Sequence, residues 1–293
     1  HVYCGKRHSR VTYVELSSQG LEGSLSPHIG NLSFLRTLSL WNNSFQGAIP
    51  QELGCLFRLR HLNLSYNKFN ELVGSIPNEI SILTKLTYLS FRKNKLTGGI
   101  PAILGNITSL EVFSVTRNPL GGSIPNILSR WKNLKEFSAA GCNLYGSIPH
   151  EFGYLSRLTV LNLRINKFYG VNNLTGEIPQ YFGNITSLEV LSLVENPLGG
   201  TIPDTLGYLE NLKDIYLGSC NLYGTIPNSL YNLSHLANFS LADNQLTGGL
   251  HSAIGGMLPH LVILSLWGNQ LSGPLPVSIS NCTRLRVLEL QKN

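Results

Sequence analysis

The stretch LRTLSLWNNSFQGAIPQELGCLFR, residues 35–58, decides the fold of this chain. Its pattern, LxxLxLxxNxLxGxIPxxLGxLxx, recurs with a period of about 24 residues from near the first residue to the last. An Asn closes the first half of most units, at Asn43, Asn67, Asn94, Asn118, Asn166, Asn196, Asn244, Asn269 and Asn293. Cys142 and Cys220 fill the same slot, and Gln19 opens the series.

A period of this size predicts a leucine-rich-repeat solenoid, an α/β stack of about twelve units. In each unit the LxL core alternates with the two-residue period of a strand, as Leu38 and Leu40 do around Ser39. The predicted fold is a right-handed superhelix with a concave parallel β-sheet, mostly β and irregular, with short 3-10 or helical segments on its convex side.

The Asn slot and the Gly-x-Ile-Pro phrase have physical reasons. The chain turns sharply after each strand and leaves backbone groups pointing inward, and a side-chain amide can both donate to them and accept from them. Gly permits the following bend, the aliphatic residue re-enters the core, and Pro fixes an extended backbone without needing a donor.

We expect one elongated domain, because each repeat touches only its neighbours. Residues 1–10 are assigned to the remnant of an N-terminal cap and residues 11–293 to the solenoid, truncated at its C-terminal end. The chain is 42% hydrophobic, yet it contains neither the roughly 18 consecutive apolar residues of a membrane helix nor a signal peptide. Such segments are expected outside this sequence.

The five Cys residues do not predict disulfides within the chain. Cys142 and Cys220 share a slot three repeats apart, which at about 4.8 Å per strand exceeds the roughly 7 Å limit for a bridge. We interpret Cys55, Cys142, Cys220 and Cys282 as small buried residues and Cys4 as the orphaned half of a cap bridge.

Asn-x-Ser/Thr sequons indicate the cellular compartment in which the protein resides. They occur at Asn31, Asn42, Asn63, Asn106, Asn173, Asn184, Asn232, Asn238 and Asn281. A repeat rich in Asn, Ser and Thr also produces sequons by chance. Their density nevertheless favours a glycosylated extracellular protein.

At this point the residues resemble a known family. The wording Leu-x-Gly-x-Ile-Pro, with the openings RVTYVELSSQGLEG at residues 10–23 and SPHIGNLSFL at residues 26–35, resembles the ectodomain of plant leucine-rich-repeat receptor-like kinases. The opening is most similar to the subfamily that includes the elongation factor Tu receptor and the rice bacterial-blight resistance receptor. The resemblance covers essentially the whole chain and implies the plant-type repeat.

The family implies a single-pass plasma-membrane receptor on the apoplastic side of the cell surface. Its ectodomain would bind a peptide or microbial protein ligand, in innate immunity, and would recruit a co-receptor kinase. No Gly-rich nucleotide loop, His-Arg-Asp or Asp-Phe-Gly is present, so this segment is expected to be non-catalytic, with a serine/threonine kinase elsewhere in the parent protein. The alternative is a secreted leucine-rich-repeat inhibitor of a microbial wall-degrading enzyme, or a kinase-less receptor-like protein.

The predicted binding surface is the concave sheet, where outward strand positions form columns across repeats. Arg92, Lys93 and Arg117 fall on adjacent strands, with Trp41, His61 and Tyr66 nearby. Such a basic and aromatic patch would suit an acidic or C-terminal carboxylate group of a peptide. A solvated basic face remains the alternative. Arg164 and Trp267 extend the candidate set, although an exposed Trp can also lie flat on a neighbouring side chain.

Other functions are disfavoured. The net charge is +6, but only 13% of residues are charged and no Lys/Arg run exists, so we expect no nucleic-acid partner. The eight His residues lack metal-ligand spacing, so neither a metal nor a cofactor is expected.

Two longer repeats, near residues 70–73 and 168–173, predict flanking loops that reflect either recognition or neutral drift.

Overall fold

The structure is a computed structural model that describes residues 1–5, 9–69, 74–169 and 177–293. The inserted segments that were predicted to form loops, near residues 70–73 and 168–173, lie largely outside these residues. The chain forms two compact units, His1–Leu144 and Tyr145–Asn293, which are described separately below.

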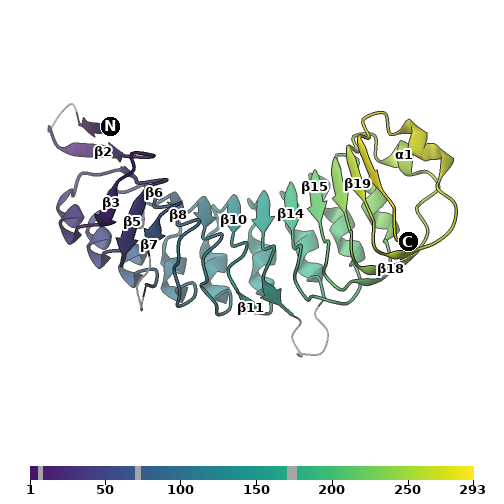
Figure 1. The fold of residues 1–293 in the computed structure, drawn as a ribbon, viewed down its shortest axis with the longest axis horizontal. Coiled ribbons are helices and arrows are strands. Elements are labelled where there is room, and N and C mark those ends of the chain that lie inside the picture. The colour runs from purple at the N-terminus through teal and green to yellow at the C-terminus, as the bar shows by residue number, and fades with distance from the viewer. Residues whose placement is uncertain (6–8, 70–73, 170–176) are drawn as a thin grey trace. The chain divides into compact units, whose positions relative to one another are not determined.

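The strand face of the first unit carries short strands in sequence order (Figure 1). They are β1 (Val2–Cys4), β2 (Val11–Glu15), β4 (Thr37–Ser39), β6 (His61–Asn63), β8 (Tyr88–Ser90), β9 (Val112–Ser114) and β10 (Glu136–Ser138). From β2 onward each pairs in parallel with the strand of the next repeat, so that Leu38 lies opposite Leu62 and Leu62 opposite Leu89. The predicted leucine-rich-repeat solenoid is confirmed.

The second unit repeats this arrangement. Its strands are β12 (Val160–Asn162), β14 (Val190–Ser192), β15 (Asp214–Tyr216), β17 (Asn238–Ser240), β19 (Ile263–Ser265) and β21 (Val287–Glu289). All pair in parallel in that order. The residue at the centre of each strand from β12 to β19 is fully buried.

The first ten residues contain a strand that the repeat pattern does not predict. β1 pairs with β2 in the antiparallel direction, with Val2 opposite Val14 and Tyr3 opposite Tyr13. It therefore covers the backbone edge of β2. Its assignment to a cap remnant remains a proposal.

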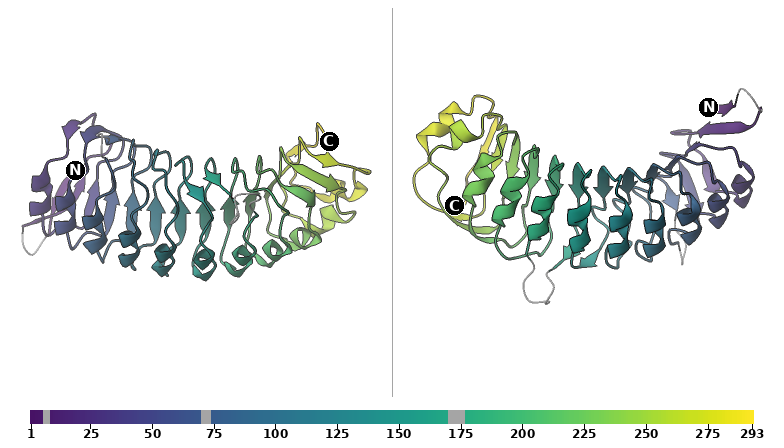
Figure 2. Two further views of the ribbon diagram at one scale, coloured as in Figure 1. Left: turned by 90° about the horizontal axis from the view of Figure 1, so that it is seen from below. Right: turned by 180° about the vertical axis from the view of Figure 1, so that it is seen from behind.

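Short 3-10 helices lie on the opposite side of each repeat from the main sheet (Figure 2). They are η1 (Pro27–Asn31), η2 (Gln51–Cys55), η3 (Asn78–Ile82), η4 (Ala102–Asn106) and η5 (Asn126–Arg130) in the first unit. The second unit has η6 (His150–Tyr154), η7 (Gln180–Asn184), η8 (Asp204–Tyr208), η9 (Asn228–Asn232), α1 (Ile254–Met257) and η10 (Val277–Asn281). Pro precedes every 3-10 helix from η2 onward, as Pro50 does with φ −63° and ψ 132°, because its ring fixes the extended entry.

Smaller parallel sheets form where each repeat turns away from the main sheet. In the first unit β3 (Glu22–Ser24), β5 (Ser44–Gly47) and β7 (Lys68–Phe69) join in this way. In the second unit β11 (Tyr145–Gly146) pairs with β13 (Lys167–Phe168), and β16 (Tyr223–Thr225), β18 (Gln245–Gly248) and β20 (Gln270–Leu271) form a third small sheet.

The predicted Asn ladder is present. The Asn67 amide donates to the carbonyls of Leu40 and Leu64 at 2.9 and 3.2 Å, and its oxygen accepts the Phe45 N–H at 3.0 Å. Thus one side chain satisfies groups of two repeats. Gln19, in contrast, is exposed and donates its side-chain amide to Ser17 O of its own turn, because its longer side chain does not enter the slot.

Cys142 and Cys220 occupy the Asn slot as predicted, and each donates its thiol to backbone carbonyls. The Cys220 Sγ lies 3.2 Å from Leu193 O and 3.3 Å from Gly218 O. Burial raises the pKa of Cys142 to about 11 and that of Cys220 to about 12, so both remain neutral thiols.

A thiol lacks the acceptor that an Asn oxygen offers, and the preceding repeat compensates for this. If position 220 were Asn, its side-chain oxygen would accept the N–H of Leu198. Because position 220 is Cys, the Leu198 N–H donates instead to Asn196 O of its own turn at 2.8 Å. Leu120 makes the same bond to Asn118 O, in the repeat before Cys142. In both places Pro follows the Asn, so the Asn-Pro turn and the Cys slot belong together.

The burial predicted for Cys55 is wrong. Cys142, Cys220 and Cys282 are buried, whereas Cys55 is exposed. Cys55 is the last residue of η2, a position whose side chain points to solvent while its neighbours Gly54 and Leu56 face the core. All five Cys residues are described, and none of them forms a disulfide.

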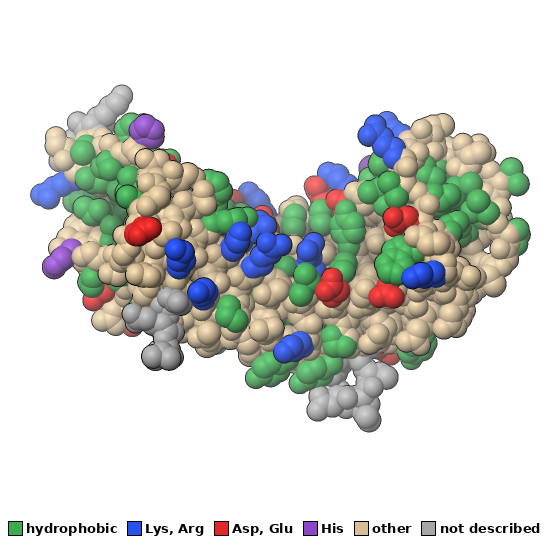
Figure 3. Space-filling model, in the orientation of Figure 1, with side chains coloured by type: hydrophobic (Ala, Val, Ile, Leu, Met, Phe, Trp, Pro, Cys, Tyr) green, Lys and Arg blue, Asp and Glu red, His purple; other side chains and the backbone are tan. Residues whose placement is uncertain are grey.

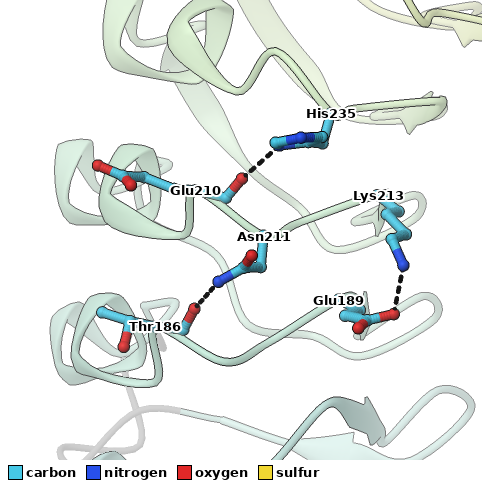
Figure 4. A network of polar contacts seen from close by, with 6 residues as sticks. All are labelled: Thr186, Glu189, Glu210, Asn211, Lys213 and His235. Atoms are coloured by element: carbon cyan, nitrogen blue, oxygen red, sulfur yellow. Dashed lines mark hydrogen bonds and ion pairs between the residues drawn. The ribbon is translucent and has the colours of Figure 1, made fainter.

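A second ladder joins the segments that follow the 3-10 helices (Figure 4). The Asn211 side chain donates to Thr186 O at 2.8 Å, and a His235 ring nitrogen lies 3.0 Å from Glu210 O. Closer to the strands, Lys213 and Glu189 form an ion pair at 2.7 Å. These contacts fix the chain between helix and strand in consecutive repeats.

Candidate binding surface on the strand face

Three residues of the first unit pack around one tyrosine ring. The Trp41 ring centroid lies 5.8 Å from that of Tyr66 at an interplanar angle of 66°. Arg92 Cζ and Lys93 Nζ lie 5.6 and 4.9 Å from the centroid of the same Tyr66 ring. The structure therefore brings together four of the predicted residues, with Tyr66 at their centre. We call Trp41, Tyr66, Arg92, Lys93 and Arg117 the basic-aromatic cluster.

The backbone fixes the direction of these side chains. Tyr66, Lys93 and Arg117 all precede the Asn or Cys slot and have positive φ values of 57°, 54° and 59°. Their N–H groups donate to the next repeat, Tyr66 to Arg92 O and Lys93 to Thr116 O, both at 2.7 Å. Because the turn is anchored in this way, consecutive repeats present these side chains along one line.

His61 lies at the start of β6 and stacks on Tyr88, with ring centroids 4.1 Å apart and an angle of 12°. Burial is the main effect on its pKa and lowers it, while the charge of Glu15 acts in the opposite direction. Tyr88 was not among the residues predicted from the sequence. Its place in the repeat could have indicated it, because it is equivalent to that of His61 in the preceding repeat.

Small hydroxyl side chains lie between the His61–Tyr88 stack and the basic-aromatic cluster. Ser65 and Ser90 are each 3% exposed, and their hydroxyls lie 2.7 Å apart. These positions point away from the core, yet the larger neighbouring side chains cover them. The two hydroxyls are therefore buried and satisfied by each other rather than offered to a ligand.

The cluster carries positive charge without a carboxylate partner. Arg92, Lys93 and Arg117 are exposed, and among the residues described here none of them lies within 4.0 Å of an Asp or Glu oxygen. Figure 3 shows Lys and Arg side chains gathered near the strands around β8 and β10. A guanidinium beside an aromatic ring can bind a planar anion by donating two parallel hydrogen bonds to it.

Arg164 and Trp267 belong to the second unit, whose strand face has a different character. Arg164 is exposed, and the Trp267 ring is half-buried with Lys292 Nζ 5.9 Å from its centroid. Carboxylates occur beside them on this face, at Asp214 and at Asp243, which accepts the Ser219 hydroxyl at 2.9 Å. The candidate residues therefore divide into a basic-aromatic group in the first unit and a mixed group in the second.

The sequons fall into distinct structural positions. Asn31, Asn106, Asn184, Asn232 and Asn281 are each the last residue of a 3-10 helix and are exposed. Asn63 and Asn238 lie in β6 and β17 and are half-buried, and Asn42 ends the turn after β4. Asn173 lies outside the described residues.

Other kinds of site were sought in the described part of the chain. Within it, no three His, Cys, Asp or Glu side chains are grouped as a metal ion requires. The same residues form no helix with the length and apolarity needed to cross a bilayer.

Comparisons with known proteins agree with this architecture. A leucine-rich-repeat region model matches residues 7–144, and a leucine-rich-repeat model matches residues 187–209, 211–233 and 260–282. The LRR receptor-like serine/threonine-protein kinase EFR of Arabidopsis thaliana is 54% identical over 44 residues, which are 15% of this chain and 4% of that protein.

Solved receptor ectodomains share the fold over nearly the whole chain. The Arabidopsis receptor kinase HAESA, in complex with the peptide hormone IDA and the co-receptor SERK1, has a TM-score of 0.89 and 33% identity over 99% of this chain and 47% of that one. A TDR receptor has a TM-score of 0.90 and 32% identity over 95% of this chain and 47% of that one.

The chain thus spans about half the length of these structures. HAESA is also solved as its leucine-rich-repeat ectodomain with a peptide hormone ligand, and similarity to such structures agrees with the expectation of a non-catalytic segment. It also supports the resemblance to plant leucine-rich-repeat receptor kinase ectodomains.

Proposed function

Because the chain is a leucine-rich-repeat protein, we propose that it is the ligand-recognition part of a plant receptor-like kinase and that its first unit binds an anionic peptide group. The observation that carries this proposal is the geometry around Tyr66, where Arg92 and Lys93 lie against one ring and have no carboxylate partner among the described residues. A surface of this kind offers charge, hydrogen-bond donors and a rigid aromatic contact in one place.

The hydrogen-bond donors of the basic-aromatic cluster indicate the class of ligand that it would bind. A carboxylate is planar and matches the two parallel N–H groups of a guanidinium, while a Lys adds a point charge. We therefore assign to this surface a peptide with an acidic side chain or a free C-terminal carboxylate.

The wider assignment rests on similarity. HAESA is solved with a peptide hormone and a co-receptor, and the short match to EFR is to a receptor-like kinase. By analogy, the parent protein would be a plasma-membrane receptor with its ectodomain on the apoplastic side and a serine/threonine kinase inside. It would pair with a co-receptor and act in innate immunity, within the subfamily that the N-terminal residues resemble.

The test uses an array of extended peptides, each present as a free C-terminal carboxylate and as the amide. Binding of the whole chain should prefer the carboxylate or acidic members and should weaken with salt. The double variant R92A/R117A should lose that binding at least tenfold. K85A removes an exposed cation from another part of the first unit and should bind as the wild type does.

Unchanged binding in R92A/R117A, or equal loss in K85A, would reject the cluster as the binding site. The first result would point to another surface. The second would point to non-specific attraction by net positive charge, as expected of a solvated basic face.

A further inference from the structure

Four of the five helix-end sequons share a geometry that the strand sequons lack, while at Asn31 the Asn is exposed and the next two residues are half-buried. At Asn106-Ile107-Thr108 the Asn and Thr are exposed and the Ile between them is fully buried. The same exposed, buried, exposed order holds for the sequons that begin at Asn184, Asn232 and Asn281. The core residue anchors the sequon, and both functional side chains remain in solvent.

We infer that the protein carries N-linked glycans on the 3-10 helix ends of both units, at Asn31, Asn106, Asn184, Asn232 and Asn281, and that Asn63 and Asn238 on the strand faces carry none. This rests on the proposed extracellular function, because the sugar is transferred in the secretory pathway. In that transfer the Asn Nδ2 attacks the anomeric carbon of a lipid-linked oligosaccharide. The C–N bond forms, Nδ2 loses a proton, and the polyprenyl pyrophosphate leaves.

The strand positions cannot hold a sugar in the folded chain. Asn63 lies in register between Ser39 and Ser90, each 3% exposed, and neighbouring strands are only about 4.8 Å apart. The third sequon residue, Ser65, is buried and bonded to Ser90. A sugar on Asn63 would crowd these covered positions, so chains modified there should fail to fold and should not leave the cell.

Asn238 is constrained in a similar way. Its side-chain amide donates to Asp214 Oδ1, and it is paired between Asp214 and Ile263 in the sheet of the second unit. Attachment of a sugar at Nδ2 would crowd this contact.

Asn184 is an exposed helix end whose neighbours at the same position are also exposed. The equivalent helix-end residues of the preceding and following repeats are Tyr154 and Tyr208, 59% and 64% exposed. A sugar at Asn184 would cover these two exposed rings, which are otherwise large apolar surfaces on this side of the second unit.

The consequence is functional. In each unit, glycans on the helix ends would close that side to protein partners, and in the first unit they would leave the strand face, with the basic-aromatic cluster, free for recognition.

The deciding experiment is glycopeptide mass spectrometry of the protein isolated from its own cells, with enzymatic release by a glycosidase that tolerates plant core fucose. We expect glycans on the five helix-end Asn residues and unmodified Asn63 and Asn238. A paired comparison of secreted variants adds a mass readout. N184Q should lose the mass of one glycan, and N63Q should change only by the mass of the substitution.

Glycans on Asn63 or Asn238 in mature protein, or bare helix ends beside modified strand sequons, would overturn the inference while leaving an extracellular receptor intact. Absence of any glycan would overturn both this inference and the extracellular location on which it depends.

Discussion

Gly183 lies so close to Thr205 of the next repeat that a Cβ at position 183 would stand 2.4 Å from the Thr205 carbonyl oxygen. The same approach occurs in other repeats, at Gly54 against Glu79 and at Gly105 against Ile127, with 2.7 and 2.8 Å. Gly in the LG phrase therefore sets the distance between successive 3-10 helices.

The substitution G183A should destabilise the protein by more than about 1 kcal/mol, because the Cβ must push two backbones apart. G256A is a matched control. A Cβ on Gly256 meets nothing within 4 Å, and the residue is exposed in α1, so Ala should stabilise by about 0.5–1 kcal/mol. Chemical denaturation of both variants checks the contrast, and similar stability changes would refute the steric explanation.

Replacing Asn244 by Cys should destabilise the protein, although Cys142 and Cys220 occupy the same slot in other repeats. Its oxygen accepts the N–H groups of Cys220 and Leu222, both at 3.0 Å, and a thiol offers no comparable acceptor. N244C should cost about 2–3 kcal/mol through two buried unsatisfied donors.

The control for this prediction is C220A, which removes only weak thiol donors and should cost about 1 kcal/mol or less. Equal losses from N244C and C220A in denaturation experiments would show that the acceptor has no importance.

Ile165 has φ +58°, a conformation that a β-branched residue rarely adopts, and it is 41% exposed. I165N should stabilise the second unit by about 1 kcal/mol, since Asn tolerates the left-handed region. D243N, at the equivalent turn with φ +56°, replaces a residue that already tolerates the left-handed region and should have little effect. If D243N raised the thermal midpoint as much as I165N, relief of backbone strain would be rejected as the cause.

Acid should weaken the first unit through His61. Burial lowers the pKa of His61 in the folded state, so the unfolded chain takes up the proton first as the pH falls. The stabilisation by neutral His61 is complete above about pH 6.5, the ordinary His value, and declines as the pH falls toward the lower folded-state pKa.

H61F keeps an aromatic ring against Tyr88 but does not titrate. The stability difference between wild type and H61F should therefore shift in favour of H61F between pH 7 and pH 5, measured by denaturation midpoints. A difference that stayed constant over this range would contradict the proposed linkage.

The sequence predicted the strands and the Asn ladder because both depend on contacts between neighbouring repeats, which share one register. It also placed Trp41, Tyr66, Arg92 and Lys93 on the same face. It did not predict that Tyr66 would be the central ring, because ring contacts depend on rotamers that the spacing leaves open. Cys55 was misplaced for a related reason, since the hydrophobic pattern does not show which way a 3-10 helix end points.

The sequence by itself determined the repeat, its register and the residue types that each turn requires, because a strict period gives every unit the same local neighbours. Only the tertiary structure decided which outward positions are covered, as at Ser65 and Ser90, and which remain free, as at Arg92 and Asn184. The physical reason is that exposure at a given repeat depends on the size and direction of side chains one repeat away, and the consensus pattern does not specify them.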